Sequence, residues 1–163
     1  MLHPPEELCI GAMELARQAA QRGEIPVGSI VCDPDWNILG QSNNQILQRK
    51  DPSAHAELLA IQAASQAVQS ERLTDHILIT TLEPCIMCTG LILHARISRV
   101  YFFTRSGWPG LLSVLDRLGS QINHHVSWRL LETYEGEASE LLLEFFQSRR
   151  ESDAPGSSSF SLD

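Results

Sequence analysis

Two cysteines three residues apart, placed directly behind a proline, constrain this chain more than any other feature. The run Pro84-Cys85-Ile86-Met87-Cys88 follows an apolar, strand-like segment, so the cysteines are expected where a helix begins. Proline suits the first helical position, because its missing N–H would have no partner there. Residues three apart share one helix face, and the exposed N–H groups of a helix start favour thiolates. The spacing therefore predicts a metal site at a strand-to-helix junction.

A second motif, His55-Ala56-Glu57, supplies what two thiolates lack. Zinc binds thiolate sulfur at about 2.3 Å and imidazole nitrogen at about 2.0 Å, usually tetrahedrally. Ligation by His55, Cys85 and Cys88 leaves the fourth position open, which is typical of a catalytic zinc, and a water in such a position has a pKa of about 7. Glu57 lies close to the metal without needing to bind it, and is predicted to carry the proton. One catalytic Zn²⁺ per chain is expected.

Together, with proline before the first cysteine, the two motifs match the known signature of zinc-dependent nucleobase deaminases. The assignment is a match to that pattern. A redox pair formed by Cys85 and Cys88 is the alternative, and the companion residues His55 and Glu57 disfavour it. Stoichiometric zinc after purification would separate the two interpretations.

Apolar periodicity predicts helices interleaved with strands along the chain. Helices are expected over 5–22, 53–69, 84–95, 111–118 and 135–150, and strands over 25–32, 38–42, 76–80, 100–104 and 126–131, with a polar loop over 43–51. In the last helix, Leu141, Leu142, Phe145 and Phe146 are expected to face inward. This order predicts a three-layer α/β/α sandwich around a five-stranded mixed sheet. Residues 1–150 are expected to form one zinc deaminase domain, followed by a disordered Ser/Gly/Pro-rich tail over 151–163.

The formal net charge of −8 argues against a non-specific nucleic-acid binder, although a local basic patch remains compatible with it. No apolar run reaches the ~18 residues that a membrane span needs. The first residues, Met1–Pro5, lack the basic and apolar regions of a signal peptide. A cytoplasmic protein without a membrane partner is therefore expected.

Beyond the metal motifs, the chain resembles the bacterial tRNA adenosine deaminases of the cytidine-deaminase superfamily over almost its whole length to Arg150. The resemblance rests on Glu24–Gly28, Asp51–Glu57, Thr81–Cys88, Ile97–Val100, Asn123–Val126 and Phe145–Arg150. It implies a cytidine-deaminase-like fold, a homodimer, and hydrolytic conversion of the wobble adenosine of a tRNA anticodon stem-loop to inosine with release of ammonia. It also implies that the Asn44 amide positions the base and that the Ala56 backbone lines the base pocket.

One loop departs from the family pattern. Family members carry an arginine, an acidic residue and a Lys-Thr-Gly-Ala-like run that contacts nucleotides flanking the target. This chain has the shorter run Arg105-Ser106-Gly107-Trp108-Pro109-Gly110. By resemblance, Arg105 and Ser106 are expected to bind substrate. The family's acidic residue contacts a ribose, where the 2′-hydroxyl distinguishes RNA from DNA, so its replacement by Ser106 predicts weaker discrimination against single-stranded DNA. In the counter-interpretation the loop is rebuilt around Trp108 and displaces Ser106.

Other interpretations stay open. The leading alternative is a deaminase of a free base or nucleoside, of the guanine or cytosine type, which the acidic charge and the altered loop favour. A non-catalytic zinc-binding subunit is a further class, disfavoured because such subunits typically lose the residue equivalent to Glu57. Trp108 either stacks on a substrate base or caps the core beside Pro109. Glu83 is either a partner of the metal site or a simple loop carboxylate.

Overall fold

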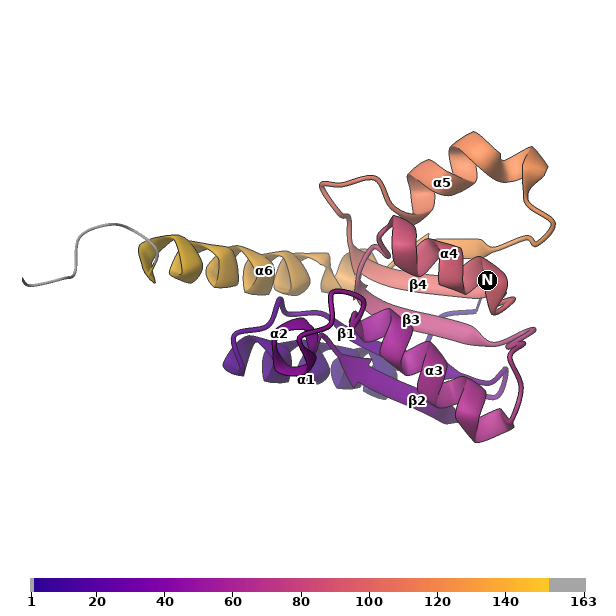
Figure 1. Cartoon of the computed structure of the whole chain (residues 1–163), viewed down its shortest axis with the longest axis horizontal. Coiled ribbons are helices and arrows are strands. Elements are labelled where there is room, and N and C mark those ends of the chain that lie inside the picture. Colours follow the sequence, from indigo (N-terminus) through magenta and orange to yellow (C-terminus); the bar gives the residue numbers. More distant parts are fainter. Residues whose placement is uncertain (1, 153–163) are drawn as a thin grey trace, which may run out of the picture.

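Five strands pair into one mixed sheet in the computed structural model, which describes residues 2–152 (Figure 1). The strands are β1 (Gly28–Cys32), β2 (Ile38–Asn43), β3 (Ile77–Leu82), β4 (Arg99–Thr104) and β5 (Ser127–Leu130), in the spatial order β2-β1-β3-β4-β5. Strand β1 runs antiparallel to β2 and β3, whereas β3, β4 and β5 are parallel. The predicted five-stranded mixed sheet is confirmed.

The central strands are apolar at successive positions because both faces of the sheet are covered. In β3, Leu78 packs into one hydrophobic cluster, and its neighbours Ile77 and Ile79 pack into the other. In β4, Phe102 and Phe103 divide in the same way. Two separate cores therefore lie on opposite faces of the sheet.

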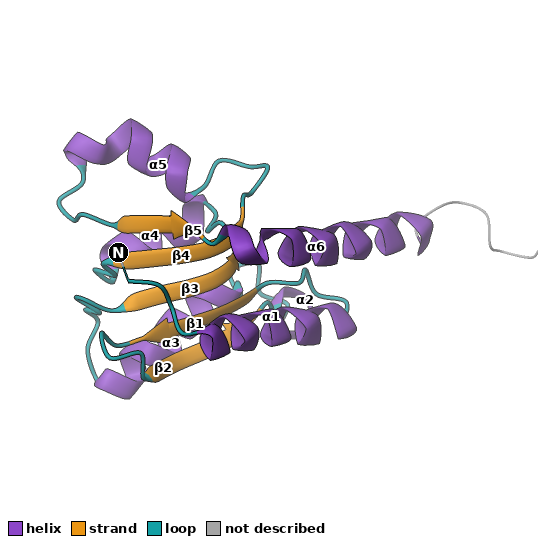
Figure 2. Cartoon of the chain, turned by 180° about the vertical axis from the view of Figure 1, so that it is seen from behind, coloured by secondary structure: helices purple, strands orange, loops and turns teal. Residues whose placement is uncertain are grey.

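Helices complete the outer layers. One face carries α1 (Glu6–Gln21) and α6 (Glu132–Ser152), which lie in front of the sheet in Figure 2. The other face carries α3 (Ala56–Val68), α4 (Ile86–His94) and α5 (Leu111–Leu118). The three-layer α/β/α prediction is thus confirmed. Among residues 2–152, no helix is both long and apolar enough to cross a membrane.

Helix α3 lies close to strand β2 at Gly40. A Cβ atom on Gly40 would come within 2.3 Å of the Ala60 carbonyl oxygen and 2.6 Å of the Ala64 nitrogen. Any side chain at this position would force the helix away from the strand. Glycine here therefore sets the height of α3 above the sheet.

Local structure differs from the expected boundaries around the metal motifs. The expected loop over 43–51 contains a one-turn helix, α2 (Ile46–Arg49), which Lys50 closes in a left-handed conformation (φ 52°). The helix expected from residue 53 begins only at Ala56, because Asp51 accepts hydrogen bonds from the Ser53 N–H and hydroxyl in a turn. Pro84 lies before α4 and is not its first residue, because the bridge between Cys85 and Gly110 keeps Cys85 extended.

The C-terminal helix is longer than expected. It starts at Glu132 and continues through Ser152, so residues 151 and 152 are helical, and the remainder of the expected tail, 153–163, lies outside the described residues. The expectation that Phe146 packs inward is wrong, because its side chain is 46% exposed. Helix α6 projects beyond the sheet (Figure 2), so its second half has no strand beneath it to cover that ring.

Candidate active site

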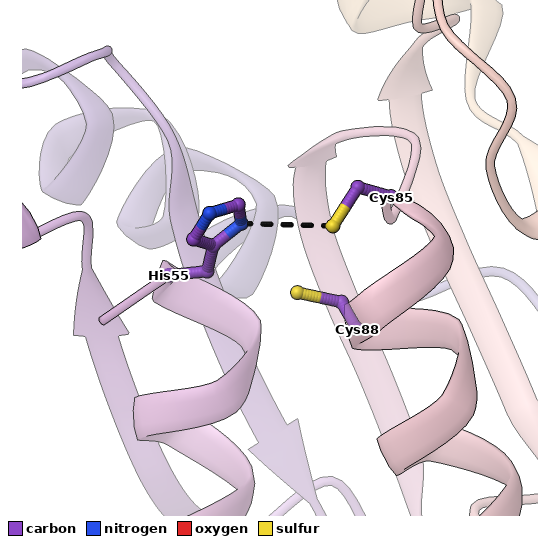
Figure 3. A group of neighbouring side chains, drawn as sticks. All are labelled: His55, Cys85 and Cys88. Atoms are coloured by element: carbon purple, nitrogen blue, oxygen red, sulfur yellow. Dashed lines mark hydrogen bonds between the residues drawn. The ribbon is translucent and has the colours of Figure 1, made fainter. Parts of the chain in front are cut away.

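Helices α3 and α4 begin side by side, and the residues that precede them, His55 and Cys85, face one another (Figure 3). His55 is the N-cap of α3 (φ −75°, ψ 150°) and Cys85 is the N-cap of α4 (φ −67°, ψ 173°). Cys88 lies in the first turn of α4. The structure therefore brings together the three residues that the sequence predicts as metal ligands.

The distances between these side chains suit a tetrahedral zinc ion. The Cys85 Sγ lies 3.7 Å from His55 Nδ1, and the three ligand atoms all lie within 4.8 Å of one another. Tetrahedral zinc at ordinary bond lengths separates sulfur from nitrogen by about 3.5 Å and the two sulfurs by about 3.8 Å. The donor set fits zinc with only small movements, and Nδ1 is the imidazole nitrogen that faces the site.

The protonation of the three side chains points the same way. A hydrogen bond from Cys88, helped by one from His55, lowers the pKa of the Cys85 thiol to about 3. In return, the hydrogen bond to Cys85 raises the pKa of Cys88 and of His55, and burial raises that of Cys88 further. Protons thus gather around one thiolate, and a divalent cation would replace them with a fixed positive charge.

Glu57 lies in the first turn of α3 with only 3% of its surface exposed. Burial raises the pKa of its carboxyl group to about 7, because desolvation disfavours the charged form. A carboxyl group with such a pKa can accept and release a proton near neutrality. Its position beside the ligand set suits a proton carrier.

Asn44 is buried next to the start of α3 and is held from both ends. Its backbone N–H donates to the Val27 carbonyl at 3.2 Å, and its side-chain Oδ1 accepts the Ala56 N–H at 2.8 Å. Because the acceptor oxygen is used, the amide presents its Nδ2 donor on the other side. The Ala56 N–H, by the same bond, is already satisfied. Whether this donor binds the substrate base stays a prediction.

Glu83 clamps the loop after β4 to the segment that carries Cys85. Its Oε2 accepts the Ser106 N–H at 3.2 Å and its Oε1 accepts the Leu112 N–H at 3.0 Å. Gly110 forms a bridge with Cys85, and the Leu111 N–H donates to the Pro84 carbonyl at 2.9 Å. Glu83 is therefore a structural partner of the site. The sequence left the role of Glu83 open, because no motif spacing predicts a carboxylate that accepts hydrogen bonds from backbone N–H groups of a distant loop.

The remaining predicted site residues lie on this clamped loop. Arg105 is exposed and forms no ion pair within residues 2–152. Ser106 is half-buried, and its hydroxyl oxygen accepts the Trp108 N–H at 3.1 Å. Trp108 is 81% exposed, so it does not cap the core. Whether Arg105 and Ser106 touch substrate stays a prediction.

Comparison with known proteins agrees with this geometry. The family model of the cytidine and deoxycytidylate deaminase zinc-binding region matches residues 4–104. The chain belongs to this deaminase family. The matched range includes the three prospective ligands together with Glu57 and Asn44, whereas the loop with Trp108 and helix α6 lie beyond it.

Individual relatives of this deaminase act on different substrates. The tRNA-specific adenosine deaminase of Haemophilus influenzae is 37% identical over 153 residues, covering 90% of this chain and 85% of the relative. A solved structure from studies of A-to-I editing by tRNA:A34 deaminases at the wobble position of transfer RNA is 31% identical with a TM-score of 0.77, covering 85% of this chain and 100% of that one. The guanine deaminase of Bacillus subtilis is 27% identical with a TM-score of 0.60, covering 96% and 98%.

Proposed function

We propose that this deaminase hydrolyses the exocyclic amino group of adenosine at the wobble position of a tRNA anticodon, giving inosine and ammonia. One observation carries the chemistry: a zinc-type donor set, a buried carboxyl group and an oriented amide donor meet where α3 and α4 begin. The likeness to tRNA-specific adenosine deaminases supports the choice of substrate.

His55, Cys85 and Cys88 would hold one Zn²⁺ per chain, and that ion, when bound, supplies a Lewis acid that makes water nucleophilic near neutral pH. Glu57 takes a proton from the attacking water and delivers it to the departing amino group, which leaves as ammonia. Its burial keeps bulk water from competing for that proton. The Asn44 Nδ2 donates to an acceptor on the base edge and fixes the ring in place.

A base inside a duplex cannot reach such a site, so the substrate must be a splayed, single-stranded nucleotide. Arg105 and Ser106 would contact the substrate from the loop after β4. Because Ser106 is uncharged, adenosine in single-stranded DNA is proposed as a weaker second substrate.

The test is to incubate the purified deaminase with a tRNA pool and with an anticodon stem-loop, and to measure inosine by mass spectrometry. Free guanine, cytosine and adenosine are offered in parallel, and Glu57→Gln serves as the inactive control. Inosine at the wobble position is expected. Ammonia released from guanine or cytosine, with no inosine in any RNA, would replace this proposal by a free-base deaminase.

The family resemblance also leads us to propose a homodimer acting on tRNA in the cytoplasm. Light scattering at micromolar concentration should give twice the 18.1 kDa chain mass. A monomer active on the stem-loop would refute the dimer and leave the chemistry intact.

A further inference from the structure

Trp108 stands apart from the other two tryptophans of the chain. Trp36 packs against Tyr101 with ring centroids 6.2 Å apart, and Trp128 stacks on Phe102 at 5.9 Å. Trp108 has no such aromatic partner within residues 2–152, and 81% of its surface is exposed. An exposed indole can stack on another flat ring, so Trp108 is available to a partner from outside the chain.

The loop that presents Trp108 is tied to the metal centre at both ends. Thr104, at the end of β4, accepts the Glu83 N–H at 2.8 Å, and Glu83 holds the Ser106 N–H. Two residues after Trp108, Gly110 bridges to Cys85, a prospective metal ligand. The backbone at Trp108 is therefore held two residues from a direct contact with the segment that carries Cys85.

Ser106 sets the conformation of the loop tip. Its hydroxyl oxygen accepts the Trp108 N–H at 3.1 Å, which closes a turn around Gly107. The hydroxyl accepts this bond and still has its own proton to donate, so it can hold the loop tip while contacting substrate.

We propose that Trp108 is a stacking platform for the base adjacent to the target nucleotide in a single-stranded RNA loop, and that Ser106 is its positioning residue. This inference rests on the proposed function and adds a substrate contact to it. Every nucleobase has a π-face, so stacking on an exposed indole binds a flanking base whatever its sequence. The net charge of −8 offers little general attraction for phosphate, so stacking is a suitable source of affinity.

Steady-state kinetics on the anticodon stem-loop test the contact. Base–aromatic stacking is worth about 5- to 150-fold in binding, so Trp108→Ala should raise KM by that factor and change kcat much less. Trp108→Phe should recover most of the loss. Ile38→Ala removes an exposed apolar side chain on the edge strand β2 and is the matched control, with wild-type KM expected.

Abasic stem-loops identify the base that stacks. In wild type, removing the base on either the 5′ or the 3′ side of the target should weaken binding, at one of these two positions only. On the stem-loop that lacks that base, Trp108→Ala should cause no further loss of binding. Ser106→Ala should raise KM in the same direction by a smaller factor. Ser106→Thr keeps the hydroxyl and should restore it.

Three results decide the matter. Wild-type inosine formation with an unchanged KM for Trp108→Ala overturns the stacking role and leaves the proposed function standing. Equal losses at both abasic positions in wild type and Trp108→Ala also overturn it. The third result concerns the substrate itself. In a Trp36→Phe, Trp128→Phe chain, only Trp108 fluoresces as an indole, so its quenching reports binding of the stem-loop. If wild type forms no inosine in any RNA and the stem-loop does not quench Trp108, the proposed substrate is refuted.

Discussion

Gly110 is the point at which the loop after β4 touches the metal-binding segment, so Gly110→Ala is an informative perturbation. A Cβ atom there would lie 2.4 Å from the Pro84 carbonyl oxygen and 3.2 Å from Glu83 Oε1. Ordinary contact begins at 3.4 Å, so the two segments must separate by about 1 Å. This separation would weaken the bridge to Cys85 and the hydrogen bond from the Leu111 N–H to the Pro84 carbonyl.

Two magnitudes follow from that displacement. Overpacking of this kind costs about 1–3 kcal/mol, and the reduced freedom of the unfolded chain offsets about 0.4–1 kcal/mol of it. A net loss of about 1–2 kcal/mol should lower Tm by about 2–8 °C for a chain of this length. A shift of about 1 Å at a group that positions the reaction should lower turnover by about 100-fold.

The assay compares thermal unfolding, zinc content and initial rates of inosine formation for Gly110→Ala and Gly107→Ala. A Cβ atom on Gly107 would meet nothing within 4 Å, so this variant adds the same methyl group to the same loop without a clash. It should behave like wild type. The reasoning is refuted if Gly110→Ala matches Gly107→Ala in both Tm and rate.

Three further predictions concern the site itself. Cys88→Ala should abolish stoichiometric zinc and turnover, whereas full zinc occupancy by elemental analysis would show that Cys88 is not a ligand. Glu57→Gln should keep zinc and fold but lose about 100- to 10,000-fold in kcat, and a near-normal rate would mean that another group moves the proton. Asn44→Asp keeps an acceptor for the Ala56 N–H but removes the donor, so kcat/KM should fall at least about tenfold with little change in Tm; unchanged kinetics would place the base elsewhere.

The sequence predicted the layers and the sheet because their signals are local. The apolar runs of β3 and β4 are long enough to identify buried strands, and Gly23 and Pro84 mark boundaries to within a few residues. The convergence of His55 with Cys85 followed from motif order, which links residue types that meet only in the folded chain.

Contacts made through backbone groups were not predictable in this way. The clamp at Glu83 depends on N–H groups whose positions follow from the path of the loop, and the sequence specifies only a carboxylate beside a proline. The one-turn helix α2 depends on the left-handed Lys50, a conformation that no propensity favours for lysine. Phe146 is exposed because α6 outruns the sheet, which is a matter of relative lengths that periodicity does not report.

The close seat of α3 on Gly40 has a consequence for the metal centre. The contact with Ala60 lies five residues, or about 7.5 Å along the axis, from His55, and α3 behaves as a stiff rod over that distance. Gly40 has no chemical role of its own, yet its contact fixes the tilt of α3 and so the position of the imidazole at the start of the helix. A change of tilt at Gly40 would change the distance from His55 to the two sulfurs. The geometry of the ligand set therefore depends on a residue of the edge strand β2.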